Sequence, residues 1–361
     1  MDTSEDFDRP PGNTLRWMTL SAVLLLLAGT FAYAGGWLSP HRLTPARIVD
    51  ELQFAGGGAH PGFRRNHAKG VCVSGYFEGN GLASVYSRAQ LFEKVRTPVV
   101  GRFAIAGGNP YAADDAAPVR SMALRFNQAD GQQWRTGMNN MPVFSVAKPE
   151  GFLAQLEAGR KDPATGKPDP AKQAAFFAAH PETAAFRRWA KSAKPSSSFA
   201  TERYHGLNAF YFVDASGRRQ AVRWKMVPES AGTANGVAAG KDVLIAELRD
   251  RLAKAPQRWH LMISLAQPGD PTNDATREWP SDRREIDAGT LTIVEETSQD
   301  GGACRDINYD PTVLPDGIAV SDDPLLTARS AAYSNSHLRR TREEAGVPDP
   351  LAGRAAHKET H

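Results

Sequence analysis

The decisive stretch of sequence lies near the end of the chain and reads Asp323-Pro324-Leu325-Leu326-Thr327-Ala328-Arg329-Ser330-Ala331-Ala332-Tyr333-Ser334-Asn335-Ser336-His337-Leu338-Arg339-Arg340. At helical spacing, Arg329 and Tyr333 stand at positions i and i+4 and therefore share one face of a helix. Arg340 follows two turns later and faces the same way if the helix continues. A guanidinium beside a tyrosine favours the anionic phenolate, a hard oxygen donor suited to ferric iron. A packed surface helix contains the same pair by chance, so the other motifs decide its meaning.

The composition indicates a sizeable globular domain that is close to electrically balanced. The chain has 361 residues, 41% of them hydrophobic, with 43 basic and 40 acidic side chains and a formal net charge of +3. This length supports a substantial core, and the charge balance argues against a polyanionic partner such as nucleic acid. The 32 glycines and 25 prolines indicate many turns, which favours a loop-rich β or α+β protein.

The cysteine inventory consists of Cys72 and Cys304, with no Cys-x-x-Cys pair. It argues against a zinc or iron–sulfur site. The two residues are compatible with a single disulfide in an oxidising compartment, and equally with a buried thiol at Cys72. The sequence leaves this choice open.

The N-terminal part of the chain is organised around one long apolar segment. Residues 1–16 are polar and predict a disordered N-terminus. Residues 17–38 form an uncharged run of 22 residues, long enough to cross a bilayer as a helix, with a tryptophan near each end. We favour an uncleaved transmembrane anchor, although Ala32-Tyr33-Ala34 also resembles the cleavage site of a secretory signal. Residues 39–55 predict a linker and an approach helix.

The rest of the sequence predicts one domain over residues 56–342, followed by a flexible tail at 343–361. Extended segments are expected at 70–77, 99–106, 121–127, 132–146, 208–213, 220–227, 259–266 and 289–296. Helices are expected at 150–158, 171–180, 182–192 and 241–253. Strands spaced by turns and divided by a helical insertion predict an eight-stranded antiparallel β-barrel with flanking helices. The expected fold class is therefore α+β, with one N-terminal transmembrane helix.

Two further motifs carry side chains suited to chemistry. The first is Arg64-Arg65-Asn66-His67-Ala68-Lys69-Gly70, followed by Val71-Cys72-Val73-Ser74-Gly75-Tyr76-Phe77-Glu78. It places His67 just before a strand, where a histidine can act as acid and base, although an isolated loop histidine is usually structural. The second is Gly137-Met138-Asn139-Asn140-Met141-Pro142-Val143-Phe144. Its asparagines either form a turn or aim an amide at a ligand oxygen.

In this order, the three motifs resemble those of the haem catalase family. The string Arg-x-x-His-Ala-Lys-Gly…Gly-Tyr-Phe-Glu resembles the distal-histidine motif, and Asn-Asn-x-Pro-Val-Phe resembles the distal-asparagine motif. The helix with Arg329 and Tyr333 resembles the proximal-tyrosine motif, preceded by Asp310-Pro311…Leu314-Pro315-Asp316-Gly317-Ile318. The segments 101–103 and 119–126 also match. The resemblance covers roughly residues 50–342, and three ordered motifs make it specific.

The resemblance implies a site for haem b, iron protoporphyrin IX, with a role for each residue. Tyr333 would be the axial ligand of the iron, held as phenolate by Arg329. His67 would be the distal acid–base residue, and Asn139 would be the amide that orients the peroxide. The haem propionates would pair with Arg64, Arg102 and Arg340, and the distal pocket would be walled by Phe144 and Phe152.

Departures from the family pattern favour a peroxidase over a catalase. Full catalases carry a longer wrapping arm and a C-terminal helical domain, so the chain is similar to the short catalase-related peroxidases. The usual valine before the histidine is Asn66, a serine that assists the histidine is replaced by Ala104, and the histidine that supports the proximal arginine falls on Asn208. The expected activity is reduction of hydrogen peroxide and organic hydroperoxides with an external electron donor, with weak or no catalase activity.

Three alternative functions stay open: a true catalase, a catalase-fold hydroperoxide isomerase, and a non-catalytic haem-binding membrane protein. No counterpart of the dinucleotide region of large catalases is recognised, so no NADPH is expected. We expect an unknown small electron donor, no nucleic-acid partner, and a monomer or small homo-oligomer. The haem domain is expected in the periplasm, either anchored to the membrane or secreted after cleavage of the apolar segment.

Overall fold

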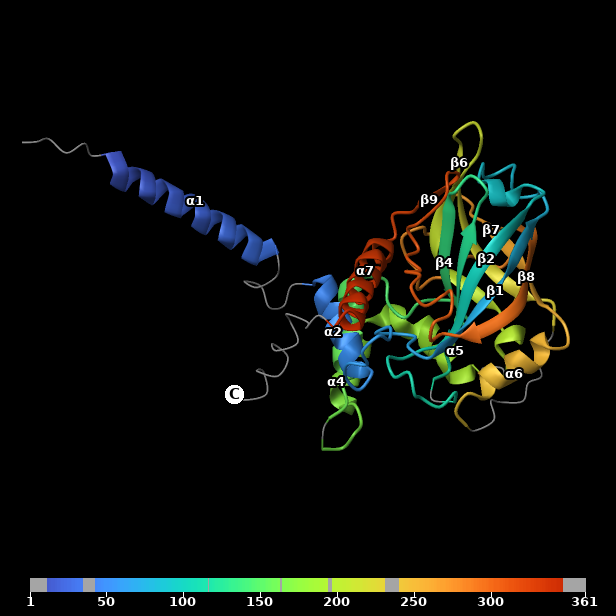
Figure 1. Cartoon of the computed structure of the whole chain (residues 1–361), viewed down its shortest axis with the longest axis horizontal. Coiled ribbons are helices and arrows are strands. Elements are labelled where there is room, and N and C mark those ends of the chain that lie inside the picture. The colour runs from blue at the N-terminus through green and yellow to red at the C-terminus, as the bar shows by residue number, and fades with distance from the viewer. Residues whose placement is uncertain are drawn as a thin grey trace, which may run out of the picture. The chain divides into compact units, whose positions relative to one another are not determined.

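The computed structural model describes most of the chain. The described residues are 12–34, 43–115, 117–162, 164–193, 197–230 and 240–346. They form two compact units, of which the first ends at Thr44 and the second begins at Pro45. Figure 1 shows the helix α1 of the first unit and the β-barrel with its helices in the second.

The first unit contains the helix α1 (Gly12–Ala34). Its segment Arg16–Ala34 is long and apolar enough to cross a membrane, and a signal sequence would pass the same test of length and composition. The helix begins at Gly12, so residues 12–16 are helical where the polar composition predicted disorder; polar residues are tolerated in a first helical turn. Residues 1–11 and residues 35–38 of the predicted anchor lie outside the described part of the chain.

The second unit is built on a closed antiparallel β-barrel. Its strands are β1 (Gly70–Gly79), β2 (Arg96–Ile105), β3 (Arg120–Asn127), β4 (Gln133–Asn139), β5 (Tyr204–Val213), β6 (Arg219–Pro228), β7 (Gln257–Leu265) and β8 (Glu285–Ser298). Each strand pairs with the next one along the chain, and β8 returns to pair with β1. The predicted eight-stranded barrel is confirmed.

The seam between β4 and β5 is closed in two ways. At one end, within the described residues, the two strands share a single pair, Asn139 with His205. Elsewhere the chain before the last helix contacts both strands: Arg135 N on β4 donates a 2.9 Å hydrogen bond to Val313 O, and β9 (Ile318–Val320) pairs with β5. The barrel is therefore completed by a segment that follows all eight strands in sequence.

The barrel interior is filled by side chains. Along β4, Trp134, Thr136 and Met138 are buried while their neighbours are half-buried, which is the period of two expected for a strand. Aromatic rings from other strands pack with them, including Phe77, Phe103, Phe126, Tyr204, Phe212 and Trp259. The interior is therefore packed core, as small barrels usually are.

Helices gather on one side of this barrel (Figure 1). They are α2 (Pro45–Ala55), α3 (Pro149–Ala158), α4 (Pro170–Ala179), α5 (Ala184–Ser192) and α7 (Pro324–Glu344). Both α2 and α3 pack against α7, whereas a further helix, α6 (Val243–Leu252), contacts β8. The start of α7 is well specified, because Pro324 takes the first position and Asp323 accepts a 2.9 Å hydrogen bond from Leu325 N. The helix continues through Arg340, as its spacing required.

Several element boundaries differ from the sequence predictions, and three of these differences lie near the cavity or the end of the domain. The strand expected over 132–146 ends at Asn139, because Pro142 has no backbone donor to continue a ladder. The helix expected from 182 begins at Ala184, after a short 3₁₀ turn. The last helix runs past residue 342 to Glu344, and residues 347–361 of the predicted tail lie outside the described part.

A disulfide joins Cys72 on β1 to Cys304 in the loop after β8, with Cα atoms 5.3 Å apart. The pairing that the sequence left open is thereby resolved in favour of a bond. Both residues are fully buried. The bond fixes the loop between β8 and β9 against the outside of the barrel.

Candidate active site

A cavity of about 490 Å³ lies between strands β2–β4 and the helices α2, α3 and α7. Its volume is within the range of ~300–1,000 Å³ that is typical of small-ligand sites. Every residue predicted for the site lines this cavity: Arg64, His67, Arg102, Asn139, Phe144, Phe152, Arg329, Tyr333 and Arg340. Segments that are distant in sequence therefore converge on one place.

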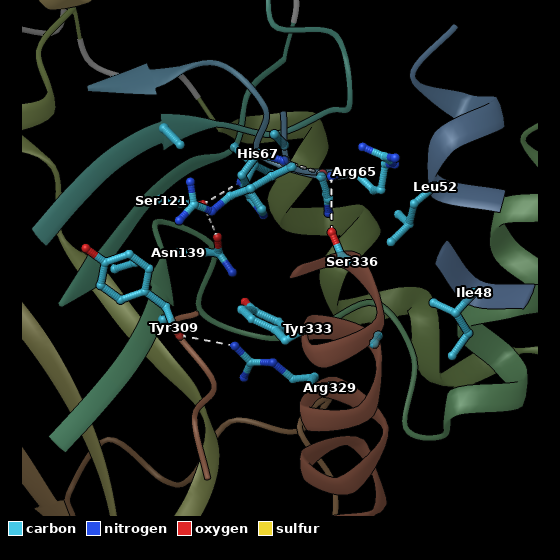
Figure 2. A pocket seen from close by; sticks show the side chains of 18 of the residues that line it. Ile48, Leu52, Arg65, His67, Ser121, Asn139, Tyr309, Arg329, Tyr333 and Ser336 are labelled. Atoms are coloured by element: carbon cyan, nitrogen blue, oxygen red, sulfur yellow. Dashed lines mark hydrogen bonds between the residues drawn. The ribbon is translucent and has the colours of Figure 1, made fainter. Parts of the chain in front are cut away.

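Tyr333 enters the cavity from α7 (Figure 2). One turn earlier, Arg329 lies over its ring, with the guanidinium carbon 5.8 Å from the ring centroid. Arg329 Nη1 donates to Asn208 Oδ1, and Asn208 Nδ2 donates to Asp323 Oδ2 at 2.8 Å. Gly137 leaves room for the pair, since a Cβ there would lie 3.5 Å from the tyrosine Oη. Arg329 is thus connected through Asn208 to Asp323, the residue that caps its own helix.

His67 reaches the cavity from the turn before β1, opposite the tyrosine helix (Figure 2). Its φ is +52°, in the left-handed region that residues with a Cβ rarely adopt. Asn66 holds this turn, because its Oδ1 accepts hydrogen bonds from His67 N at 2.9 Å and from Gly107 N at 3.0 Å. Ala68 N adds a 2.9 Å bond to Gly107 O. The unusual backbone that aims the imidazole is therefore fixed by the residue before it.

Ser121 joins the histidine to the asparagine. Its Oγ lies 2.9 Å from His67 Nδ1 and donates to Asn139 Oδ1 (Figure 2). Ser121 and Asn139 are directly opposite each other on β3 and β4, so their side chains share one face. On its other side Ser121 pairs with Ala104 of β2. A hydroxyl therefore reaches His67 from β3. It lies beside Ala104 on β2, the position at which the sequence predicted that the assisting serine is missing.

The imidazole of His67 is neutral at physiological pH. Burial, followed by the positive charge of Arg102, lowers its pKa from 6.5 to about 4. Arg329 and Arg64 contribute smaller decreases to this value, and a backbone hydrogen bond with Ile105 acts in the opposite direction. A neutral imidazole inside a cavity is able to accept a proton from a substrate.

Three arginines present positive charge to the cavity. Burial, followed by the positive charge of Arg340, lowers the pKa of Arg64 from 12.5 to about 10. Burial lowers the pKa of Arg102 well below its ordinary value, with Arg64 as the second cause. Their hydrogen bonds go to neutral groups: Arg64 to the Cys304, Arg305 and Ile307 carbonyls, Arg102 to Ala68 O and Gln299 Oε1, and Arg340 to His337 Nδ1.

These arginines fit the carboxylates of a haem. Among the described side chains, the Nε atoms of Arg102 and Arg340 are buried without a partner. Buried cations require anionic partners, and the planar guanidinium matches a carboxylate. No group of three His, Cys, Asp or Glu side chains among the described residues could hold a metal ion. The Phe144 and Phe152 rings, 5.6 Å apart, supply an apolar wall for a flat ring system.

Comparison with known sequences places this arrangement in a family. The catalase family model matches residues 62–346. The chain belongs to the catalase family. A catalase-related peroxidase of Synechococcus elongatus is 39% identical over 331 residues, which are 91% of this chain and 97% of that protein. A catalase-related peroxidase of Mycolicibacterium paratuberculosis is 33% identical over 313 residues, covering 85% of this chain and 98% of that protein.

Longer catalases are similar over only part of their length. The catalase of Rattus norvegicus is 27% identical over 297 residues, which are 76% of this chain and 55% of that protein. A bacterial catalase structure superposes with a TM-score of 0.68 at 21% identity, covering 78% of this chain and 58% of that one. A fungal catalase structure gives a TM-score of 0.69 at 19% identity, covering 78% and 60%. The catalase fold is shown, and within the family the chain belongs to the short, catalase-related group.

Two features of the site escaped the sequence analysis. Ser121 was quoted within a matching segment, but its contact with His67 depends on strand register, which the letters do not give. The contacts of Asn66 and Asn208, which stand where the family pattern has a valine and a histidine, were also not predicted: Asn66 holds the histidine turn, and Asn208 accepts a hydrogen bond from Arg329. An asparagine beside a residue that needs an unusual backbone was the available signal.

Proposed function

We propose that this protein is a haem-dependent peroxidase that reduces hydrogen peroxide and organic hydroperoxides with electrons from a small external donor. The observation that carries the proposal is a single cavity that Tyr333 enters from α7, with a neutral His67 facing it that is linked through Ser121 to Asn139. The name catalase-related peroxidase, borne by the two similar short proteins, agrees with it.

The proposed mechanism uses the protein to place a proton. His67 Nε2 accepts the proton of a peroxide O–H and returns it to the departing oxygen, so that the product is water or an alcohol. Its Nδ1 is engaged with Ser121, which leaves Nε2 for this task. The Asn139 amide donates a hydrogen bond that holds the peroxide in line with the imidazole. Haem, when bound, supplies the redox chemistry of its iron.

The remaining residues would hold the cofactor. Tyr333 would hold the haem iron through its phenolic oxygen, and Arg329 places a positive charge over its ring. Arg64, Arg102 and Arg340 would bind the propionates, while Phe144 and Phe152 would contact the ring. We propose haem b, because covalent haem attachment uses cysteines and both cysteines of this chain are joined in a disulfide.

The test uses the full chain, purified in detergent and loaded with haem. Hydrogen peroxide and a bulky organic hydroperoxide are supplied with and without an oxidisable dye, while dye oxidation and oxygen release are followed. The proposal predicts dye oxidation with little oxygen, lost in His67→Ala, and loss of the haem absorption band in Tyr333→Phe. Vigorous oxygen release would assign a catalase, and rearranged hydroperoxide without dye oxidation would assign an isomerase. Haem binding without turnover would make the protein a binding protein only.

We further propose that the domain works outside the cytoplasm, attached to the membrane by α1. The support is the long apolar helix together with the buried disulfide, since structural disulfides persist in oxidising compartments such as the periplasm. Cell fractionation, followed by protease treatment of intact spheroplasts, tests the proposal. A protected, cytoplasmic domain with free thiols would refute it, and a soluble, shortened protein would indicate a cleaved signal.

A further inference from the structure

The hydroxyl of Ser121 contacts both residues assigned to the peroxide side of the cavity. It contacts His67 Nδ1 at 2.9 Å and Asn139 Oδ1 by a shorter hydrogen bond. The side chain is nearly buried, with 8% of its surface exposed, and it lines the cavity. Strand pairing fixes its position, because its neighbours across the sheet are Ala104 on β2 and Asn139 on β4.

The single proton of the Ser121 hydroxyl determines the direction of its hydrogen bond with His67. A serine hydroxyl has one proton to donate and two lone pairs that accept. Since the proton is donated to Asn139 Oδ1, the bond to His67 must be accepted by Oγ, and Nδ1 must carry the hydrogen. In a neutral imidazole the other nitrogen, Nε2, is then without a proton. At the same time Asn139 Oδ1 is turned toward Ser121 on β3, which leaves the NH₂ group of Asn139 as the donor to a ligand.

We propose that Ser121 is a positioning residue that sets the tautomer of His67 and the orientation of the Asn139 amide together. The inference rests on the proposed peroxidase function, in which Nε2 accepts a proton while the amide donates a hydrogen bond. One hydroxyl thereby makes the two groups complementary to a peroxide, which presents one proton and an adjacent oxygen lone pair. Without it, the Asn139 amide loses the partner that orients it, and the imidazole retains its backbone hydrogen bond with Ile105 but loses its side-chain partner.

The position of Ala104 provides a rescue experiment. Ala104 is fully buried, lines the cavity and stands directly across from Ser121, so a serine there would present its hydroxyl on the same face. A hydroxyl at 104 is one strand farther from Asn139, which pairs with residue 121 and not with 104. The double variant Ser121→Ala, Ala104→Ser is therefore expected to restore the partner of His67 without restoring the partner of Asn139.

The matched control is Ser145→Ala. Ser145 is as buried as Ser121 and also lines the cavity, but its hydroxyl donates to Gln155 Oε1 at 2.6 Å and touches neither His67 nor Asn139. Ser121→Thr serves as the conservative variant, because threonine keeps the hydroxyl and suits a strand. Haem content and circular dichroism identify any variant that has failed to fold.

The measurement is the association rate of hydrogen cyanide with the haem-loaded full chain, followed by the shift of the main haem absorption band. Hydrogen cyanide must give up its proton to a base as it binds, so its association rate reports whether His67 Nε2 is unprotonated and able to accept that proton. Its dissociation rate reports the hydrogen bond that Asn139 donates to the bound ligand. Loss of one hydrogen bond predicts about a tenfold change in each rate for Ser121→Ala. The threonine variant should restore both rates, and the double variant should restore association alone.

Each outcome decides the question. If Ser121→Ala binds and releases cyanide like Ser145→Ala, Ser121 is not a positioning residue. If Ser121→Ala is slow but Ser121→Thr does not recover, the effect comes from packing and the inference also fails. If His67→Ala leaves cyanide association unchanged in the otherwise unaltered chain, the proposed role of His67 fails instead, which separates the two proposals.

Discussion

Removal of the Cys72–Cys304 disulfide is the perturbation whose size follows most directly from the structure. The bond joins residues 232 positions apart, so it closes most of the domain into one loop. In the chain-entropy model, a loop of this length stabilises the folded state by about 5 kcal/mol. For a domain of this size, we expect the double variant Cys72→Ala, Cys304→Ala to unfold roughly 10 °C lower than the parent.

Thermal unfolding followed by circular dichroism measures this difference in the haem-loaded full chain. Mild reduction of the parent is the cleaner form of the test, since it breaks the bond without removing a buried atom. The reductant should lower the unfolding temperature of the parent and leave that of the double variant unchanged. A change below about 2 °C in both comparisons, equivalent to about 1 kcal/mol, would refute the loop-closure reasoning.

The bond has a second expected effect, on the cofactor. Arg64 donates to three carbonyls, those of Cys304, Arg305 and Ile307, all in the loop that the disulfide fixes. A loosened loop releases this guanidinium, so the double variant should also lose haem faster to an acceptor protein. Equal haem loss from the two proteins would show that the carbonyl contacts position Arg64 without help from the disulfide.

Three other predictions concern the charged groups of the cavity. Arg102→Met removes a charge-assisted hydrogen bond and should therefore weaken haem affinity about 10- to 100-fold. Arg258→Met, on the exposed surface of β7, should leave the affinity unchanged. Equal losses of affinity in the two variants would refute a propionate role for Arg102. Because the pKa of His67 is about 4, dye oxidation should persist well below pH 6.5 and fall near pH 4; a fall centred near pH 6.5 would contradict the neutral, buried imidazole. The lowered pKa values of His67 and His205 mean that the unfolded chain binds more protons than the folded chain between pH 4 and 6.5. Stability should therefore decline as pH falls through that window, and the decline should be less steep in His67→Gln or His205→Gln. Unchanged slopes would contradict both pKa shifts.

Much of the site could be predicted from local spacing. Arg329, Tyr333 and Arg340 were placed on one helical face because the helical period is fixed by backbone geometry, and all three line the cavity. The barrel was predicted from its turns and alternating segments, and its eight strands are present. Information of this kind is carried by residues that are close in the chain.

Contacts that depend on register could not be predicted in the same way. The contact of Ser121 with His67 depends on which residues face each other across β2 and β3, because a shift of one residue would turn Ser121 to the other face of the sheet. The partners of Arg64 are backbone carbonyls, which have no signature in the sequence at all. The end of β4 was missed because the extended segment predicted over 132–146 was continued through Pro142, which lies in the loop beyond the strand.

The seam of the barrel has a consequence for how the protein loses activity on heating. The residues that complete the contact between β4 and β5, namely Val313 and β9, run without a break into α7 and Tyr333. Opening of this seam and withdrawal of the tyrosine are therefore a single local event, and such events require less free energy than global unfolding. The cofactor should consequently leave while seven of the eight strand-to-strand contacts still hold, and cooling in the presence of haem should bring the activity back.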